Sequence, residues 1–338
     1  MKSFNIKNNS SVYIGESFSN IYKYIPRKNV VIITDEMVYN LYKDKFPSFP
    51  IIKIGVGEEV KTLKSVENIF REFMNIGVDR GFHILGIGGG IVCDICGFVA
   101  STFMRGLPFS FVSTTLLSSV DASVGGKNGV NLDKFKNMIG TFTQPKSVIC
   151  DIKMLQSLSE KEIINGYAEI IKHAIIGDYK LFLKLEESQP LSIQKELIEF
   201  FINRSIKLKS EIVNQDERES GIRKKLNFGH TIGHAVENFY SLSHGEAVGY
   251  GLFIESKISN IFGSLSDVDY HRIKDLLKKN KLFKHRDFVK SVIIKNYKSD
   301  KKRRSFSIDV VQIEKIGKSR IKHFSLNDYD AFLNLVIE

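Results

Sequence analysis

The sequence lacks the features that mark secreted and membrane-spanning proteins. Three cysteines in 338 residues are too few for a disulfide framework and indicate a reducing compartment. No apolar run approaches the roughly 18 residues that span a bilayer. Residues 1–9 also lack the apolar segment of a secretion signal. We therefore expect a cytoplasmic protein without a membrane partner.

The chain also lacks any recognisable nucleic-acid-binding signature, although its net charge is +11. The basic residues are spread along the sequence, and only residues 301–304 form a tight basic run. No helix-turn-helix, zinc-finger or RNA-recognition motif lies beside that run. A small acidic substrate explains the charge more economically, so we expect no nucleic-acid partner.

The hydrophobic content of 43% and the length allow two globular domains. In residues 1–155, strand-length apolar runs alternate with amphipathic stretches such as 63–76 and 91–104, which predicts an α/β domain with a mostly parallel sheet. The runs lie at 30–34, 51–54, 82–87, 109–112 and 147–150. Residues 156–338 read as mainly helical. Their expected helices are 160–176, 191–213, 222–239, 245–262 and 267–280, and a strand is expected at 305–316.

Three of the eight histidines fall within 15 residues, at His230, His234 and His244. If residues 222–239 form one helix, a single face carries Arg223, Asn227, His230, His234 and Glu237. Gly229 and Gly233 each cost such a helix roughly 1 kcal/mol, which indicates close approach by a partner helix or a ligand. We interpret the segment as an active-site helix that helps to hold a metal. The alternative is a set of buried histidines satisfied by hydrogen bonds.

A glycine-rich turn follows the apolar run 82–87 and opens a helix. Its three consecutive glycines, Gly88, Gly89 and Gly90, let the backbone approach a pyrophosphate, and the helix N-terminus favours the anion. The turn is not the G-x-G-x-x-G fingerprint, because position 91 is Ile. Asp35, at the end of an earlier strand, could hold ribose hydroxyls. A plain strand-end or N-cap aspartate is the alternative.

Further polar residues follow this turn. Thr114 and Thr115 come directly after a strand, where their hydroxyls can cap a helix or contact a cofactor. Lys127 lies in a stretch rich in Gly, Lys and Asn that we expect to be a loop, where a cation meets a phosphate easily. A chance loop lysine is the alternative.

Cys93 and Cys96 form a C-x-x-C pair. A structural zinc would need a second pair, and only Cys150 remains. A redox pair would need its own fold context, so we expect small, buried helix residues instead.

Taken together, these motifs resemble the 3-dehydroquinate synthase family of sugar-phosphate cyclases. The resemblance runs from residues 57–61 to 300–302 and rests on 88–140, 167–172, 216–219, 227–230 and 244–247. It implies a dehydroquinate synthase-like fold, with an N-terminal Rossmann-like domain, a helical C-terminal domain and an active-site cleft between them. It also implies a homodimer that uses NAD and a divalent metal, zinc or cobalt.

The resemblance also assigns roles to individual residues. The metal would be bound by Glu169, His230 and His244, which moves His234 from the metal to the substrate. The NAD site would comprise Asp35, Glu58, Lys61, Gly88, Gly89, Gly90, Asp94, Thr114, Thr115, Asp121, Lys127, Lys136, Leu155 and Ser157. The substrate phosphate and carboxylate would meet Arg105, Lys127, Asn137, Lys172, Lys209, Arg223, Asn227, His234, Lys301 and Lys302.

The implied reaction converts 3-deoxy-D-arabino-heptulosonate 7-phosphate, a phosphorylated keto-acid sugar, to 3-dehydroquinate and phosphate, the second step of the shikimate pathway. It proceeds by transient oxidation with NAD, phosphate elimination, re-reduction, ring opening and an intramolecular aldol.

Departures from the family pattern at Cys93, Cys96, Ser113 and Asn128 leave room for a specialised cyclase acting on sedoheptulose 7-phosphate or glucose 6-phosphate. An iron-type polyol dehydrogenase is a further alternative, although it would lack the dense set of phosphate-binding lysines. A non-catalytic binding module is the remotest one.

Overall fold

The computed structural model describes residues 1–7, 9–133, 135–237, 239–283, 289–300 and 307–337. The chain forms two compact units, of which the first comprises Met1–Leu158 and Ile198–Glu217 and the second Ser159–Leu197 and Arg218–Glu338. The division into continuous domains 1–155 and 156–338 stays a prediction, and in the structure residues 198–217 return to the first unit. Among the described residues, no helix combines the length and apolarity needed to cross a membrane.

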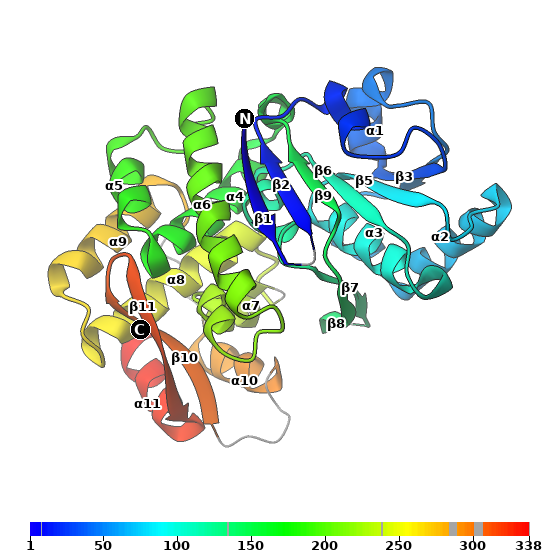
Figure 1. Cartoon of the computed structure of the whole chain (residues 1–338). Helices are drawn as coiled ribbons and strands as arrows, with labels where there is room; N and C mark the ends of the chain where they lie inside the picture. Colours follow the sequence, from blue (N-terminus) through cyan, green and yellow to red (C-terminus); the bar gives the residue numbers. More distant parts are fainter. Residues whose placement is uncertain (8, 134, 238, 284–288, 301–306, 338) are drawn as a thin grey trace. The chain divides into compact units, whose positions relative to one another are not determined.

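A seven-stranded sheet forms the centre of the first unit, in the order β1-β2-β9-β6-β5-β3-β4 (Figure 1). Neighbouring strands are parallel except β1 and β2. The strands are β1 Lys2–Ile6, β2 Ser10–Ile14, β3 Val30–Asp35, β4 Ile51–Ile54, β5 His83–Gly88, β6 Phe109–Ser113 and β9 Ser147–Cys150. The five predicted strands and the mostly parallel sheet are confirmed, because strands buried on both faces read as continuous apolar runs.

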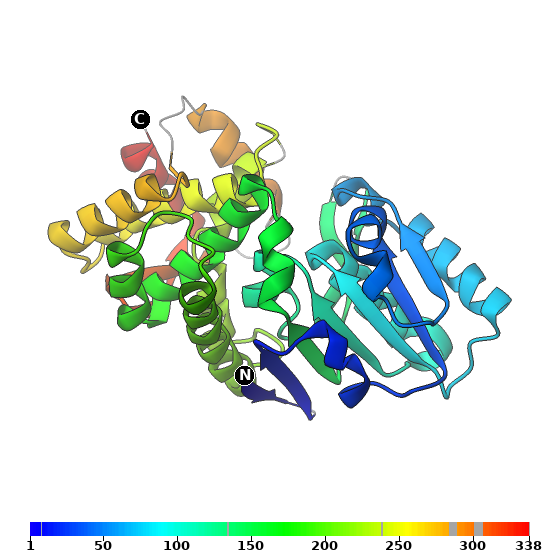
Figure 2. The same ribbon diagram turned by 90° about the horizontal axis from the view of Figure 1, so that it is seen from above.

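Helices lie beside this sheet (Figure 2). They are α1 Glu36–Tyr42, α2 Leu63–Ile76, α3 Gly90–Thr102 and most of α6 Lys195–Gln215. Thr62 caps α2 through its side chain, and Gly77 ends it in the left-handed conformation. The helix expected to reach residue 104 ends at Thr102, since Met104 and Arg105 both have positive φ.

The stretch expected to be a loop around Lys127 is a β-hairpin, so that prediction is wrong. Its strands are β7 Lys127–Leu132 and β8 Phe135–Phe142. The glycines that suggested a loop serve close approach instead. A Cβ at Gly140 would lie 2.4 Å from the carbonyl oxygen of Asn128 on the paired strand.

The second unit is mainly helical, as predicted. Its helices are α4 Glu160–Gly177, α5 Tyr179–Glu187, α7 His230–Glu237, α8 His244–Ile261, α9 Asp267–Lys279, α10 Lys290–Asp300 and α11 Leu326–Val336. An antiparallel hairpin, β10 Ser307–Lys315 and β11 Lys318–Ser325, accompanies them. An apolar core that includes Ile232, Tyr250, Ile254, Tyr329 and Leu333 joins α7, α8 and α11.

Residues 222–239 do not form the single helix that the periodicity predicted. A 3-10 helix, Ile222–Asn227, ends before Phe228, and α7 begins at His230. Gly229 between them has φ +81°, a conformation that breaks a right-handed helix. The expected shared face is therefore wrong, because Arg223 and Asn227 precede the break.

Candidate active site

Three side chains from three helices of the second unit meet at one point. Glu169 comes from α4, and His230 and His244 are the first residues of α7 and α8. Their ligand atoms lie within 4.8 Å of one another. His244 Nε2 is 3.1 Å and His230 Nε2 is 3.4 Å from the same oxygen, Glu169 Oε1. Two imidazoles and a carboxylate are a ligand set typical of catalytic zinc, which keeps a fourth position for water or substrate.

Electrostatics keeps two of these three groups, Glu169 and His230, in metal-binding forms. Burial opposes ionisation of Glu169, but Lys172 and His230 outweigh it and hold the pKa of the carboxyl well below its usual range. Burial and the charge of Lys172 lower the pKa of His230 to about 4. Burial also acts to lower the pKa of His244, but its hydrogen bond to Glu169 raises it overall. An ionised carboxylate and a neutral imidazole are the protonation states that bind a metal.

Glycines allow the two histidine-bearing helices to approach closely. A Cβ on Gly251 of α8 would lie 1.8 Å from the carbonyl oxygen of Gly229, and one on Gly233 would lie 3.1 Å from that of Ala247. The prediction that Gly229 and Gly233 mark a close approach is confirmed, and α8 is the partner helix.

The structure places His234 beside the cluster but not in it. Its ring centroid lies 5.4 Å from that of His230, and its side chain is exposed. Helical spacing alone pairs His230 with His234, whereas the three-ligand cluster contains His244. Lys172 is buried, and its ammonium forms an ion pair with Glu169.

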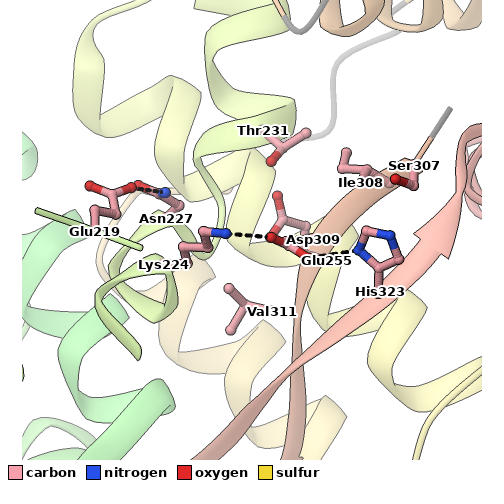
Figure 3. Close-up of a pocket in the computed structure, with 10 residues that line it drawn as sticks. All are labelled: Glu219, Lys224, Asn227, Thr231, Glu255, Ser307, Ile308, Asp309, Val311 and His323. Atoms are coloured by element: carbon pink, nitrogen blue, oxygen red, sulfur yellow. Dashed lines mark hydrogen bonds and ion pairs between the residues drawn. The ribbon is translucent and has the colours of Figure 1, made fainter. Parts of the chain in front are cut away.

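Asn227 lines a polar pocket of about 510 Å³ (Figure 3). Its Nδ2 donates to Glu219 Oε1 at 2.5 Å. Across the pocket, Asp309 of β10 binds Lys224 Nζ at 2.7 Å and His323 Nδ1 of β11 at 2.9 Å. The sequence did not single out Lys224, Asp309 or His323, because the hairpin residues belong to no recognised motif and lie about 90 residues after Lys224. Arg223, at the start of the 3-10 helix, is buried.

In the first unit, many of the predicted NAD-binding residues follow the carboxyl ends of parallel strands. Asp35 ends β3, Gly88 ends β5, and Thr114 follows β6. Carboxyl ends of parallel strands meet at one edge of a sheet, where α/β folds bind nucleotides. Gly89, the N-cap of α3, has no side chain that could cap the first-turn N–H groups. Leu155 and Ser157 lie in the 3-10 helix Ile152–Ser157, which follows β9.

Asp35 also has a structural role. Its Oδ1 accepts the N–H of Val38 at 2.8 Å and so caps α1, and burial raises the pKa of its carboxyl. The N-cap alternative for Asp35 is therefore confirmed as a contact, and its role at a cofactor stays a prediction.

Two groups of predicted site residues are linked in the first unit. Lys61 Nζ forms a buried ion pair with Asp94 and donates to Asn137 Oδ1 at 2.5 Å. Lys209 Nζ lies 2.7 Å from Asp121 Oδ1 and donates to the Asp121 carbonyl oxygen at 2.7 Å. Separately, Glu58 Oε1 accepts from Asn131 Nδ2 at 2.8 Å. Lys127 and Lys136 lie on the β7–β8 hairpin.

Arg105 is not brought together with these residues. It follows the far end of α3, whose 13 residues extend about 20 Å from the glycine turn. There it lines a pocket with Asp79 and Arg80, which precede the amino end of β5. Lys301 and Lys302 lie outside the described residues.

Comparisons with known proteins point to one family. Family models described as 3-dehydroquinate synthase N-terminal and C-terminal match residues 51–165 and 166–303. The chain is 39% identical over 302 residues to 3-dehydroquinate synthase from Thermodesulfovibrio yellowstonii, covering 87% of this chain and 84% of that protein.

Solved structures share the fold. A 2-deoxy-scyllo-inosose synthase complexed with carbaglucose-6-phosphate, NAD⁺ and Co²⁺ is similar with a TM-score of 0.88 and 24% identity, over 99% of both chains. A 2-epi-5-epi-valiolone synthase from Streptomyces hygroscopicus with bound NAD⁺ and Zn²⁺ gives 0.87 and 23%, over 99% of this chain and 98% of that one. At these identities the two structures show the fold alone.

Proposed function

The chain belongs to the 3-dehydroquinate synthase family, and on that premise we propose that it converts 3-deoxy-D-arabino-heptulosonate 7-phosphate to 3-dehydroquinate and phosphate. The observation that carries this proposal is the cluster of Glu169, His230 and His244, with the buried ammonium of Lys172 beside it. A buried carboxylate faced by two imidazoles is a costly arrangement unless a cation or another partner compensates the charge.

The cluster fits a divalent metal. Glu169, His230 and His244 would hold Zn²⁺ or Co²⁺, and NAD would lie at the strand ends near Gly88, Gly89 and Thr114. Bound there, the metal would acidify a substrate hydroxyl, and NAD would take up a hydride and later return it, so that no NADH accumulates.

The chain's own residues would bind and orient the substrate. Lys172, whose charge compensates that of Glu169, would keep the carboxylate ionised and fixed. Two of these residues, Arg223 and Asn227, lie in the 3-10 helix before α7, and His234 lies in α7 itself. All three would meet the carboxylate and phosphate of the substrate. Fixed polar and charged groups contribute most where they hold an anionic substrate in one orientation.

The substrate and cofactor assignments of the remaining residues are also part of the proposal. Among them, Lys61 with Asp94 and Asn137, and Lys209 with Asp121, form the linked groups described above. We further propose a homodimer located in the cytoplasm. The three cysteines, all free and buried, are consistent with a reducing compartment.

A direct assay tests the proposed function. The purified protein, supplied with NAD, Co²⁺ and the heptulosonate phosphate, should release one phosphate per substrate with no net NADH. Sedoheptulose 7-phosphate and glucose 6-phosphate, tested in parallel, should not turn over. Phosphate release from only one of those two sugars would favour a specialised cyclase, and net NADH formed from a polyol would favour a dehydrogenase.

A further inference from the structure

A buried carboxylate outside the metal cluster holds the peptide group next to His230. Glu255 lies on α8, and only 2% of its surface is exposed. Its Oε2 accepts the backbone N–H of Gly229 at 2.8 Å, across 26 residues of sequence. Glu255 comes 11 residues after His244 on the same helix, about 16 Å along the axis. That separation is too long for Glu255 to join His244 as a metal ligand.

The same peptide group also contacts the ring of His230. The carbonyl of Phe228 and the N–H of Gly229 belong to one planar peptide unit. The Phe228 carbonyl oxygen lies 3.2 Å from His230 Nδ1. A carbonyl can only accept, so His230 must carry its proton on Nδ1 when this bond forms. Its Nε2 is then the unprotonated nitrogen, and Nε2 is the atom that faces Glu169.

The local packing leaves this peptide little freedom. Gly229 has φ +81°, and a Cβ at this position would lie 2.8 Å from the Leu252 side chain and 2.9 Å from its backbone nitrogen. Gly251 and Leu252 lie closely against Gly229, and Glu255, which accepts the N–H of Gly229, comes one helical turn later on α8. The glycine brings the peptide within reach of α8, and the carboxylate fixes its direction.

We infer that Glu255 is a positioning residue for the metal site, which acts on His230 through the Phe228–Gly229 peptide. Metal-binding histidines commonly donate their second nitrogen to a carboxylate or a carbonyl, which fixes the tautomer and the ring direction. Here the carbonyl does this directly, and a charged acceptor on the other side of the peptide strengthens that bond by polarising it. The inference rests on the proposed function, because it assumes that His230 binds a metal.

Variants of Glu255 test the inference through Co²⁺ affinity, measured by competition with a chelator, and through the visible absorption spectrum of bound Co²⁺. Glu255→Met removes the acceptor at nearly constant length. Glu255→Asp keeps the charge but withdraws it by one methylene. Loss of such an outer partner weakens metal binding about 10- to 100-fold, and both variants should show this loss and an altered spectrum. Glu255→Gln, which keeps an acceptor oxygen, should restore most of the affinity.

Ser259→Ala is the matched control. Ser259 is buried one turn further along α8, and its Oγ accepts the N–H of Ile313 at 3.0 Å. Its loss removes this bond and the one that Ser259 Oγ donates to the backbone carbonyl oxygen of Glu255 at 2.9 Å, but it leaves the Glu255 carboxylate bound to Gly229. The control should be destabilised towards urea but should bind Co²⁺ with wild-type affinity.

The possible outcomes distinguish a failure of the positioning role of Glu255 from a failure of the proposed metal site. If Glu255→Met or Glu255→Asp bound Co²⁺ as tightly as Ser259→Ala does, the positioning role would be overturned. Nuclear magnetic resonance of the metal-free protein gives a second criterion, since Glu255→Asp should lower the population of the Nδ1-protonated tautomer of His230 and an unchanged population contradicts the inference. A wild-type protein that bound no Co²⁺ would overturn the proposed metal site itself.

Discussion

Lys172 and the two histidines contact different oxygens of Glu169. The ammonium of Lys172, three residues along α4, pairs with Oε2, whereas His230 and His244 both face Oε1. All of the Glu169 side chain and nearly all of the Lys172 side chain are buried. The ammonium of Lys172, on the same helix, thus balances the negative charge at Oε2, whereas Oε1 faces the two imidazoles. Lys172 compensates the carboxylate charge before any metal binds.

This arrangement predicts a metal-dependent stability defect in Lys172→Met. Removing one partner of a buried ion pair costs about 3–5 kcal/mol, because the other charge is left uncompensated. The metal-free variant should therefore lose several kcal/mol in urea unfolding at neutral pH. Saturating Co²⁺ should recover part of that loss, because the metal supplies positive charge to Glu169.

Lys184→Met is the control for this prediction. Lys184 pairs with Glu187 at the same three-residue spacing on α5, but both side chains are exposed. An exposed pair contributes about 0–1 kcal/mol. Equal losses of stability in the two variants would show that the Lys172 pair has no special role.

The roles of the three histidines are separable by experiment. His230→Ala and His244→Ala should each lose bound Co²⁺ on dialysis, because each removes one of three ligands. His234→Ala should keep its metal, because the ring of His234 lies outside the ligand cluster. It should lose turnover, because His234 is proposed to bind the substrate. Metal content and turnover of the same preparations provide the comparison. Equal metal loss in His234→Ala would contradict the assignment.

The sequence predicted most of the buried strands and helices, but it did not predict where the chain breaks between them. Apolar runs identified the parallel strands, since a buried parallel strand is apolar on both faces. β1 and β2, with the sequences KSFNI and SSVYI, are short and partly polar, so they were missed. Helical periodicity continued through residue 229, because the spacing of side chains carries no information about backbone angles. The positive φ of Gly229, which breaks the helix, therefore could not be predicted from it.

The metal cluster shows the same limit. Glu169 comes 61 residues before His230, and no spacing rule joins residues at that distance. Only the resemblance of several motifs to one family brought the two together. Spacing also favoured His234 over His244, because it assumes a continuous helix and ignores the turn between α7 and α8. Glu255 carried no sequence signal, since a lone glutamate in an apolar helix resembles any other.

A buried histidine in the first unit predicts a pH-dependent loss of stability. His83 lies in β5, and its Nε2 is 3.0 Å from the Ser110 hydroxyl. Burial and the nearby charge of Lys146 lower the pKa of His83 to about 4, from an ordinary value of 6.5. Between these values the unfolded chain binds a proton that the folded chain does not. The titration of His83 therefore does not reduce the free energy of unfolding above pH 6.5. As the pH drops towards 4, it lowers the free energy of unfolding by about 3 kcal/mol in total.

His83→Gln separates this effect from other titrations, because glutamine can keep the bond to Ser110 but does not ionise. Urea unfolding at several pH values between 7 and 4.5 should show a shallower decline for the variant than for the wild type. Parallel curves would exclude His83 as the source.

Asp35 offers a test of the nucleotide site that separates cofactor binding from helix capping. Asn and Asp are equally good N-caps, so Asp35→Asn should retain the cap of α1 and the stability of the fold. It should nevertheless weaken NAD binding about tenfold or more, because hydrogen bonds from ribose hydroxyls to a charged acceptor are stronger than those to an amide. Asp178→Asn is the matched control, since Asp178 caps α5 by accepting the N–H of Leu181 at 3.0 Å. Fluorescence titration with NADH measures both affinities. If Asp35→Asn bound NADH as tightly as the control, the carboxylate would act as a cap only, and ribose recognition would have to come from other residues at the carboxyl edge of the sheet.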